Sequence, residues 1–265
     1  MLSFRFGTVG SPKSTPSSPG GSQGATIHIR ELGLSALEIG WVRSVRVSAK
    51  TCEKIKAAAE ENDVALSVHA PYYINLNADE DEWPKSRGRL MDAARSGHLA
   101  GATDIIFHPG SYFDQPPEQV IPGVIERLRG CVQELRAEEN PVTLRPETMG
   151  KGAVIGSLED TLSMSQAIDG VEPCLDFPHL HARPGDGSMN TYDEWMQTLQ
   201  AYADVLGEES LQRLHIHLSG IDYTEKGEQE HLPIQETWCT LEAIPPILLS
   251  LENLRSCFYE PRIEG

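Results

Sequence analysis

Eight side chains that commonly bind metal ions stand where short apolar runs of the sequence end. They are five of the nine histidines and three carboxylates: His69, His108, Glu147, Asp176, His179, His217, His231 and Glu260. Imidazole and carboxylate groups are the usual protein ligands of zinc and related divalent ions. So many of them in equivalent positions predict a buried site for more than one metal ion.

The apolar runs themselves predict buried parallel strands. Each is rich in apolar and β-branched residues and becomes polar near its end. They read VALSVHAP, DIIFHPG, VTLRPET, VEPCLDFPH, RLHIHLSG and LRSCFYEP, with FRFGTVG and SALEIGWV near the start. Segments with helical spacing separate them, at 51–61, 83–100, 117–138, 158–168, 192–206 and 234–251.

This alternation of strand and helix over 265 residues predicts a (β/α)₈ TIM barrel, with 1–265 as a single domain. In such a barrel the C-terminal ends of all the strands open on one face, so ligands scattered along the sequence become neighbours there. A doubly wound open sheet is the structural alternative, but it would spread them along an edge and normally carries a glycine fingerprint. The stretch at 11–24, rich in Ser, Pro and Gly, is expected to be a loop between the first strand and the first helix.

The sequence predicts a cytoplasmic protein without membrane contact, and a monomer is the expected state although no sequence feature reports on it. No segment has the length and hydrophobicity of a membrane span or the pattern of a signal peptide. The five cysteines include no C-x-x-C pair, which is typical of reduced thiols. The net charge of −17 argues against a nucleic-acid partner, since such binders normally present a basic face. Adaptation to a high-salt host would explain this acidity, and divalent ions can still make an active face positive.

Three of these positions also allow other interpretations. Arg145 could pair with Glu147, but residues two apart on a strand share a face, so Arg145 should lie one layer deeper. His215 and His217 are related in the same way. His217 is nearer the strand end and is the expected ligand, while His215 is expected to be a hydrogen-bonded core residue. His231, taken alone, would be a surface residue on the loop after the seventh strand.

Taken together, the motifs HAPYYINL, HPG, PET, D-x-x-H, H-x-S-G and a terminal E-P resemble a known family. It is the endonuclease IV family of metal-dependent AP endonucleases, within the xylose-isomerase-like barrels. The resemblance covers nearly the whole chain and is closest to the archaeal branch, whose loops are similar to GIDYTEKGEQEHLP. It implies base-excision repair of damaged double-stranded DNA, by cleavage 5′ to an abasic site that leaves a 3′-hydroxyl and a 5′-deoxyribose phosphate.

The resemblance also implies a trinuclear zinc site. One ion would be held by His69, His108 and Glu147. Glu147 would bridge to a second ion, whose other ligands would be Asp176, His217 and Glu260. The third ion would be held by His179 and His231.

The third site departs from the family pattern. The family completes it with an aspartate two residues before the last histidine, and this chain has Gln229 there. Glu228, Glu230 or Asp222 would have to substitute, or water beside the neutral amide. We therefore expect two or three zinc ions, with manganese as an alternative because the same ligands suit it.

Paired ions would lower the pKa of a bridging water, orient the phosphodiester and neutralise the leaving oxygen. Glu147, the bridging carboxylate, is the expected catalytic residue. Tyr72 and Tyr73 match the family's loop that enters the DNA, where an aromatic wedge can hold open a duplex that lacks a base. Further DNA contacts are expected from cationic side chains near strand ends: Arg43, Arg46, Lys151 and Arg183.

A single-metal sugar isomerase or epimerase of the same superfamily is the main alternative. It would use four ligands, Glu147, Asp176, His217 and Glu260. It would not need the other four histidines, and this surplus favours the nuclease. A family member that binds metal without turnover is a third hypothesis, suggested by Gln229 and by the acidic composition.

Overall fold

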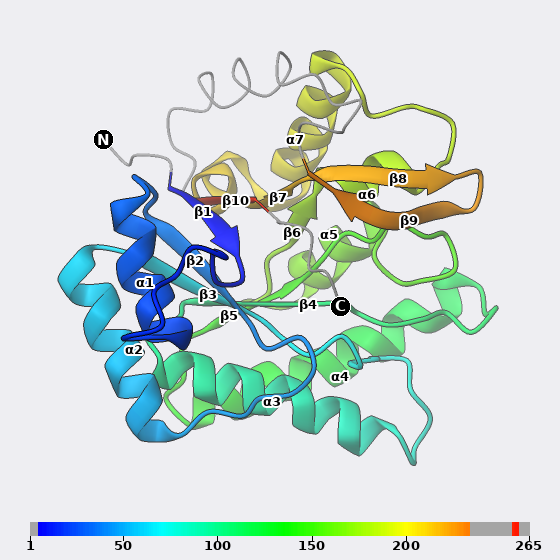
Figure 1. Cartoon of the computed structure of the whole chain (residues 1–265). Helices are drawn as coiled ribbons and strands as arrows, with labels where there is room; N and C mark the ends of the chain where they lie inside the picture. The colour runs from blue at the N-terminus through cyan, green and yellow to red at the C-terminus, as the bar shows by residue number, and fades with distance from the viewer. Residues whose placement is uncertain (1–4, 234–255, 260–265) are drawn as a thin grey trace.

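In the computed structural model, residues 5–233 and 256–259 are described, and eight parallel strands form a barrel (Figure 1). The strands are β1 (Phe6–Val9), β2 (Ala36–Gly40), β3 (Ala65–His69), β4 (Asp104–Phe107), β5 (Thr143–Pro146), β6 (Cys174–Asp176), β7 (His215–Leu218) and β10 (Ser256–Tyr259). Their order is β5-β4-β3-β2-β1-β10-β7-β6. Parallel bridges between Leu144 and Val171 and between Glu147 and Cys174 join the two edges. The sheet therefore closes. This confirms the predicted TIM barrel and excludes the alternative of a doubly wound open sheet.

Helices surround this barrel (Figure 1). They are α1 (Gly21–Glu31), α2 (Ala49–Asn62), α3 (Trp83–Leu99), α4 (Pro117–Ala137), α5 (Leu158–Ala167), α6 (Phe177–Ala182) and α7 (Tyr192–Leu206), followed by the 3₁₀ helix η1 (Glu208–Arg213). Capping boxes begin two of them, pairing Ser157 with Asp160 and Thr191 with Glu194. The predictions for α2, α3, α4, α5 and α7 agree to within two residues. The predicted helix at 234–251 lies outside the described residues.

Two predicted loops are regular structure instead. The first is the end of the 11–24 stretch, which forms the first turn of α1. Gly24 packs there so tightly that a Cβ would lie 1.8 Å from the Pro19 carbonyl oxygen, and burial outweighs the low helix propensity of glycine. The second follows β7, where β8 (Gly220–Thr224) and β9 (Gly227–Leu232) form an antiparallel hairpin.

Apolar side chains stabilise the barrel in two large clusters and a small third one formed by Val9 and Ala36. The largest joins β2 to β5 with α1 to α4, and the second joins β6 and β7 with α7. Arg145 is buried beneath Glu147, as predicted, and pairs with Asp104 at 2.5 Å and Glu172 at 3.1 Å. Among the described residues, none of the helices combines the length and hydrophobicity needed to cross a membrane.

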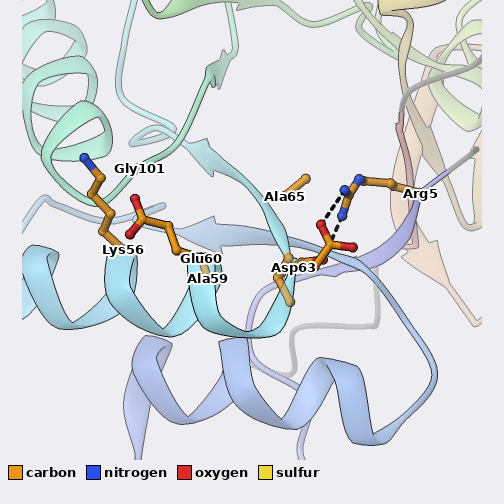
Figure 2. A pocket seen from close by; sticks show the side chains of 8 residues that line it. Arg5, Lys56, Ala59, Glu60, Asp63, Ala65 and Gly101 are labelled. Carbon is orange, nitrogen blue, oxygen red and sulfur yellow. Dashed lines mark hydrogen bonds and ion pairs between the residues drawn. The ribbon is translucent and has the colours of Figure 1, made fainter. Parts of the chain in front are cut away.

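A hollow of about 300 Å³ lies at the N-terminal ends of the strands (Figure 2). Its lining includes Arg5, which precedes β1, Asp63, which precedes β3, and Gly101, which precedes β4. The Arg5 guanidinium donates to Asp63 at 2.7 Å. This hollow is at the opposite end of the barrel from the residues expected to bind metal.

Candidate metal centre

Five neighbouring strands deliver the predicted ligands to one end of the barrel. His69 ends β3, Asp176 ends β6 and His217 lies in β7, while His108 and Glu147 directly follow β4 and β5. The structure brings together the ligand atoms of three groups, each within 4.8 Å: His69, His108 and Glu147; Glu147, Asp176 and His217; Asp176, His179 and His231. Glu260 lies outside the described residues.

Glu147 stands at the middle of these groups, and only 1% of it is exposed. Its Oε2 lies 3.2 Å from His69 Nε2 and 3.3 Å from His108 Nε2, and its Oε1 lies 3.4 Å from His217 Nδ1. Burial alone would raise the pKa of Glu147, but the surrounding imidazoles hold that pKa well below its usual range. The centre is therefore built around an anionic carboxylate that faces histidines on both sides.

Four of the histidines have one ring nitrogen held from outside the centre. The partners are the Ala70 carbonyl for His69 Nδ1 at 2.9 Å, the Thr148 carbonyl for His179 Nδ1 at 2.9 Å, Glu38 for His217 Nε2 at 3.2 Å and Ser219 Oγ for His231 Nδ1 at 2.7 Å. The opposite nitrogen of each ring faces other members of the centre. Metal-binding histidines are held in this way, because the outer hydrogen bond fixes tautomer and orientation. The donor set fits divalent ions such as zinc.

The D-x-x-H motif forms the N-terminus of helix α6, and this helix start positions its histidine. Asp176 is the N-cap of α6 and accepts a hydrogen bond from the backbone N–H of His179 at 2.6 Å. That turn places the His179 ring opposite His231, with the two Nε2 atoms 3.1 Å apart. Two such nitrogens need a proton or a cation between them.

A third group, Glu228, faces the same position, with Oε2 at 3.4 Å from His179 Nε2. The reason is a β-bulge: Asp222 pairs with Glu230 and Tyr223 with Glu228, so Gln229 is skipped. The bulge gives Glu228 the face that strict alternation would give Gln229. Burial opposes ionisation of Glu228, but the His179 ring outweighs it and lowers the pKa to about 2.

Tight packing between the loop after β5 and the hairpin holds this arrangement. A Cβ on Gly150 would lie 2.7 Å from Glu228 Cβ and 3.0 Å from His179 Cδ2, and the Glu228 N–H donates to the Gly150 carbonyl. Arg183 braces the same loop by donating to the carbonyls of Met149, Lys151 and Val154. These bonds favour a bracing role for Arg183 over the predicted phosphate contact.

The other predicted DNA contacts lie on the surface around the centre. Tyr72 stacks on the His108 ring, with centroids 4.9 Å apart, and Tyr73 is 66% exposed. The exposed side chains also include Arg43, Arg46 and Lys151. Their contact with DNA stays a prediction. Sequence reasoning did not identify Phe113, an exposed aromatic that shares a groove of about 570 Å³ with Tyr73.

Sequence reasoning also missed Glu38, which is fully buried inside the barrel below the centre. Its Oε2 lies 2.9 Å from His215 Nε2 and 3.2 Å from His217 Nε2. Burial raises the pKa of Glu38, but the two histidines hold it well below the usual range. A carboxylate in the middle of the apolar run ALEIG was the available signal. The prediction that His215 is a hydrogen-bonded core residue is confirmed.

Comparison with known sequences identifies relatives over most of the chain. The model of the xylose isomerase-like TIM barrel family matches residues 28–246. The uncharacterized protein MJ0133 of Methanocaldococcus jannaschii is 35% identical over 233 residues, 88% of this chain and 82% of that protein. Endonuclease 4 of Thermus thermophilus is 28% identical over 204 residues, 74% of this chain and 71% of the enzyme.

Solved structures share the fold at low sequence identity. The crystal structure of endonuclease IV from Thermus thermophilus superposes with a TM-score of 0.73 at 23% identity, covering 98% of this chain and 93% of that one. D-psicose 3-epimerase from Clostridium cellulolyticum gives a TM-score of 0.67 at 14% identity, covering 98% and 86%. The chain belongs to the xylose isomerase-like TIM barrel family, and its sequence resemblance to the endonuclease IV enzymes is confirmed by relatives of that name.

Proposed function

We propose that the protein is a metal-dependent phosphodiester hydrolase that incises DNA 5′ to abasic sites. The observation that supports this most is the surplus of imidazoles in the centre. His69, His108, His179 and His231 lie beside the three ligands Glu147, Asp176 and His217, which makes more donors than one ion uses. The relatives named endonuclease 4 support the same function.

The chain supplies ligands for up to three ions. His69, His108 and Glu147 would hold one, Glu147, Asp176 and His217 a second, and His179, His231 and Glu228 a third. Bound zinc would polarise the phosphodiester and provide a nucleophile at neutral pH. The protein's own contribution is to keep Glu147 anionic between the histidines and to orient their rings through outer hydrogen bonds.

The surface around the centre suits a DNA strand whose stacking is broken. Tyr73 and Phe113 expose aromatic rings along the lining of one groove, where bases can stack without sequence preference. Arg43, Arg46 and Lys151 would contact flanking phosphates. Because the net charge is −17, binding should depend on these few local cations and on the bound ions more than on the overall field.

A duplex carrying one tetrahydrofuran abasic analogue tests this function. We expect a single cut 5′ to the analogue, abolished by chelator and restored by zinc or manganese. His108→Ala should lose most of the activity, whereas His98→Ala, at an exposed position of α3, should keep it. Salt is varied because phosphate contacts weaken as salt rises. Intact DNA under every metal and salt condition would overturn the proposal.

A single-metal sugar epimerase is the alternative with an observation in its favour. Glu147, Asp176 and His217 form a compact group that would hold one ion without the other histidines. Metal analysis separates the two functions, since two or three tightly bound ions per chain support the nuclease. About one ion per chain, together with turnover of a ketohexose, would support the epimerase instead.

Glu228→Gln is expected to remove one ion from the loaded protein. The change takes away the carboxylate that faces His179. The remaining ligands His179 and His231 would then depend on Asp176, which the second ion also uses. Glu230→Gln is the matched control, two residues away and exposed. The measurement is the zinc content per chain after dialysis at fixed free zinc. Equal zinc content in both variants and the wild type would contradict a ligand role for Glu228.

A further inference from the structure

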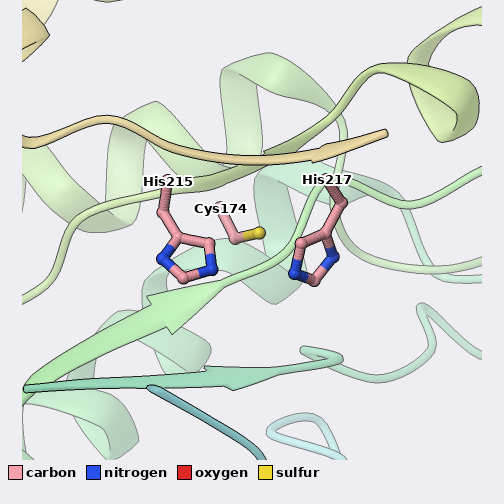
Figure 3. A group of neighbouring side chains, drawn as sticks. All are labelled: Cys174, His215 and His217. Carbon is pink, nitrogen blue, oxygen red and sulfur yellow. The ribbon is translucent and has the colours of Figure 1, made fainter. Parts of the chain in front are cut away.

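A buried hydrogen-bonded group lies directly beneath the metal centre, inside the barrel. Glu38 comes from β2, and its Oε2 accepts from Ser67 Oγ at 3.0 Å as well as from His215 Nε2 and His217 Nε2. Figure 3 shows the rings of His215 and His217 on either side of Cys174, and ligand atoms of these three residues lie within 4.8 Å of one another. These residues come from β2, β3, β6 and β7, so the group ties together strands that are far apart in the sequence.

His217 connects this inner group to the metal centre through its two nitrogens. Nε2 faces Glu38 at 3.2 Å, while Nδ1 lies 3.4 Å from Glu147 Oε1 and 3.8 Å from Asp176 Oδ2. A neutral imidazole has one N–H, and an ionised carboxylate can only accept a hydrogen bond. When His217 binds a metal ion as a neutral imidazole, Glu38 would therefore hold the N–H at Nε2 and leave the Nδ1 lone pair facing Glu147 and Asp176.

The acceptor for His217 also differs from those of the other anchored histidines. His69 and His179 donate to neutral backbone carbonyls, and His231 lies beside a serine hydroxyl. A charged acceptor forms the stronger hydrogen bond and raises the basicity of a histidine ligand. Of these four outer contacts, only the one to His217 therefore comes from a carboxylate.

We propose that Glu38 is a positioning residue for the metal centre, acting through His217, and that His215 and Ser67 hold its carboxylate in place. This inference rests on the proposed function only in taking His217 as a metal ligand. It assigns a role to a carboxylate that does not itself face the position of substrate. It also accounts for His215, which lies one layer below the centre and contacts the same Glu38 oxygen.

Zinc affinity of two Glu38 variants tests the proposal without DNA. Glu38→Leu removes the acceptor, and we expect the ion at Glu147, Asp176 and His217 to be bound about 10- to 100-fold more weakly than in the wild type. Glu38→Gln keeps one acceptor oxygen and should recover part of that loss. Ser67→Ala, which removes one bond to the same carboxylate, is the matched control and should change affinity less. The ion count at saturating zinc should match the wild type in all three.

The readouts are competition with a chromophoric chelator, zinc content per chain and circular dichroism of the metal-free proteins. Wild-type affinity in both Glu38 variants would overturn the positioning role. Loss of one equivalent of zinc at saturation in both Glu38→Leu and Cys174→Ala would overturn it too, because the inner group would then itself hold an ion. An affinity loss without any DNA incision by the wild type would uphold the role of Glu38 and refute the nuclease.

Discussion

Glu147→Gln is expected to lower the rate of incision by about 10³-fold and to weaken metal binding. Both oxygens of Glu147 face histidines, His69 and His108 on one side and His217 on the other. The amide keeps the shape of the side chain but removes the negative charge that would join two ions. Metal ions at such sites supply several kcal/mol of transition-state stabilisation, and about 4 kcal/mol corresponds to about 10³-fold in rate.

Incision kinetics and zinc content measured on the same preparations check this prediction. Glu159→Gln is the matched control, because Glu159 is exposed in the first turn of α5, a short distance along the chain. Circular dichroism and the unfolding midpoint of the metal-free proteins show whether the fold is kept. A Glu147→Gln protein with wild-type kcat/KM would exclude Glu147 from the chemistry, and full zinc content would exclude it as a ligand.

The sequence could predict the strand-end residues because parallel strands in a barrel end on the same face. Only the positions of the strands were needed to predict His69, Asp176 and the residues after β4 and β5. Apolar runs in the sequence indicate those positions well. Arg145 and His215 were placed one layer deeper by the same two-residue period. The structure agrees in each case, since both side chains are buried below the centre.

What the sequence could not predict depends on partners in three dimensions. The carboxylate of Glu38 within the apolar run ALEIG is unusual, but its partners His215 and His217 lie about 180 residues away along the chain and could not be predicted. Glu228 was one of three carboxylates expected to be able to complete the third site, but its choice over Glu230 and Asp222 depends on a β-bulge at Gln229 that the local sequence does not indicate. The two-residue period would have turned Glu228 away from His179. Local sequence patterns predict the layer of the barrel in which a side chain lies. Which side chain it contacts depends on how the strands pair in three dimensions.

Arg145→Leu is expected to lower the free energy of unfolding by about 3–5 kcal/mol, since removing one partner of a buried ion pair leaves the other uncompensated. Only 5% of the Arg145 side chain is exposed, and its guanidinium contacts Asp104 and Glu172 and donates to the carbonyls of Pro173 and Arg213. The leucine fills part of the volume but satisfies none of these acceptors. Denaturant unfolding of the metal-free protein measures the loss.

The decrease in unfolding free energy caused by Arg145→Leu should become smaller as the pH falls from 7 toward 4. Burial tends to raise the pKa of Asp104, but Arg145 outweighs it and keeps that pKa below the usual value. A lowered pKa contributes stability above the unfolded value of about 3.9, and that contribution disappears as pH falls through the folded value. In Arg145→Leu, burial is no longer opposed by Arg145 and raises the pKa of Asp104. As the pH falls, Asp104 of the variant therefore becomes protonated first, which removes its buried charge and recovers stability. In the same pH range Asp104 of the wild type stays ionised and keeps its stabilising pair.

Arg129→Leu is the control. The half-buried Arg129 pairs with the exposed Glu126 and donates to the Ala167 carbonyl, and losing these contacts should change the unfolding free energy by about 1 kcal/mol or less. Metal-free protein is used throughout so that ligand binding does not shift the unfolding curve. If Arg145→Leu and the wild type differ by a constant amount from pH 7 to pH 4, the lost stability is packing alone. If the difference in unfolding free energy becomes smaller toward pH 4, the lost stability comes from the charge with which Arg145 compensates Asp104 beneath the metal centre.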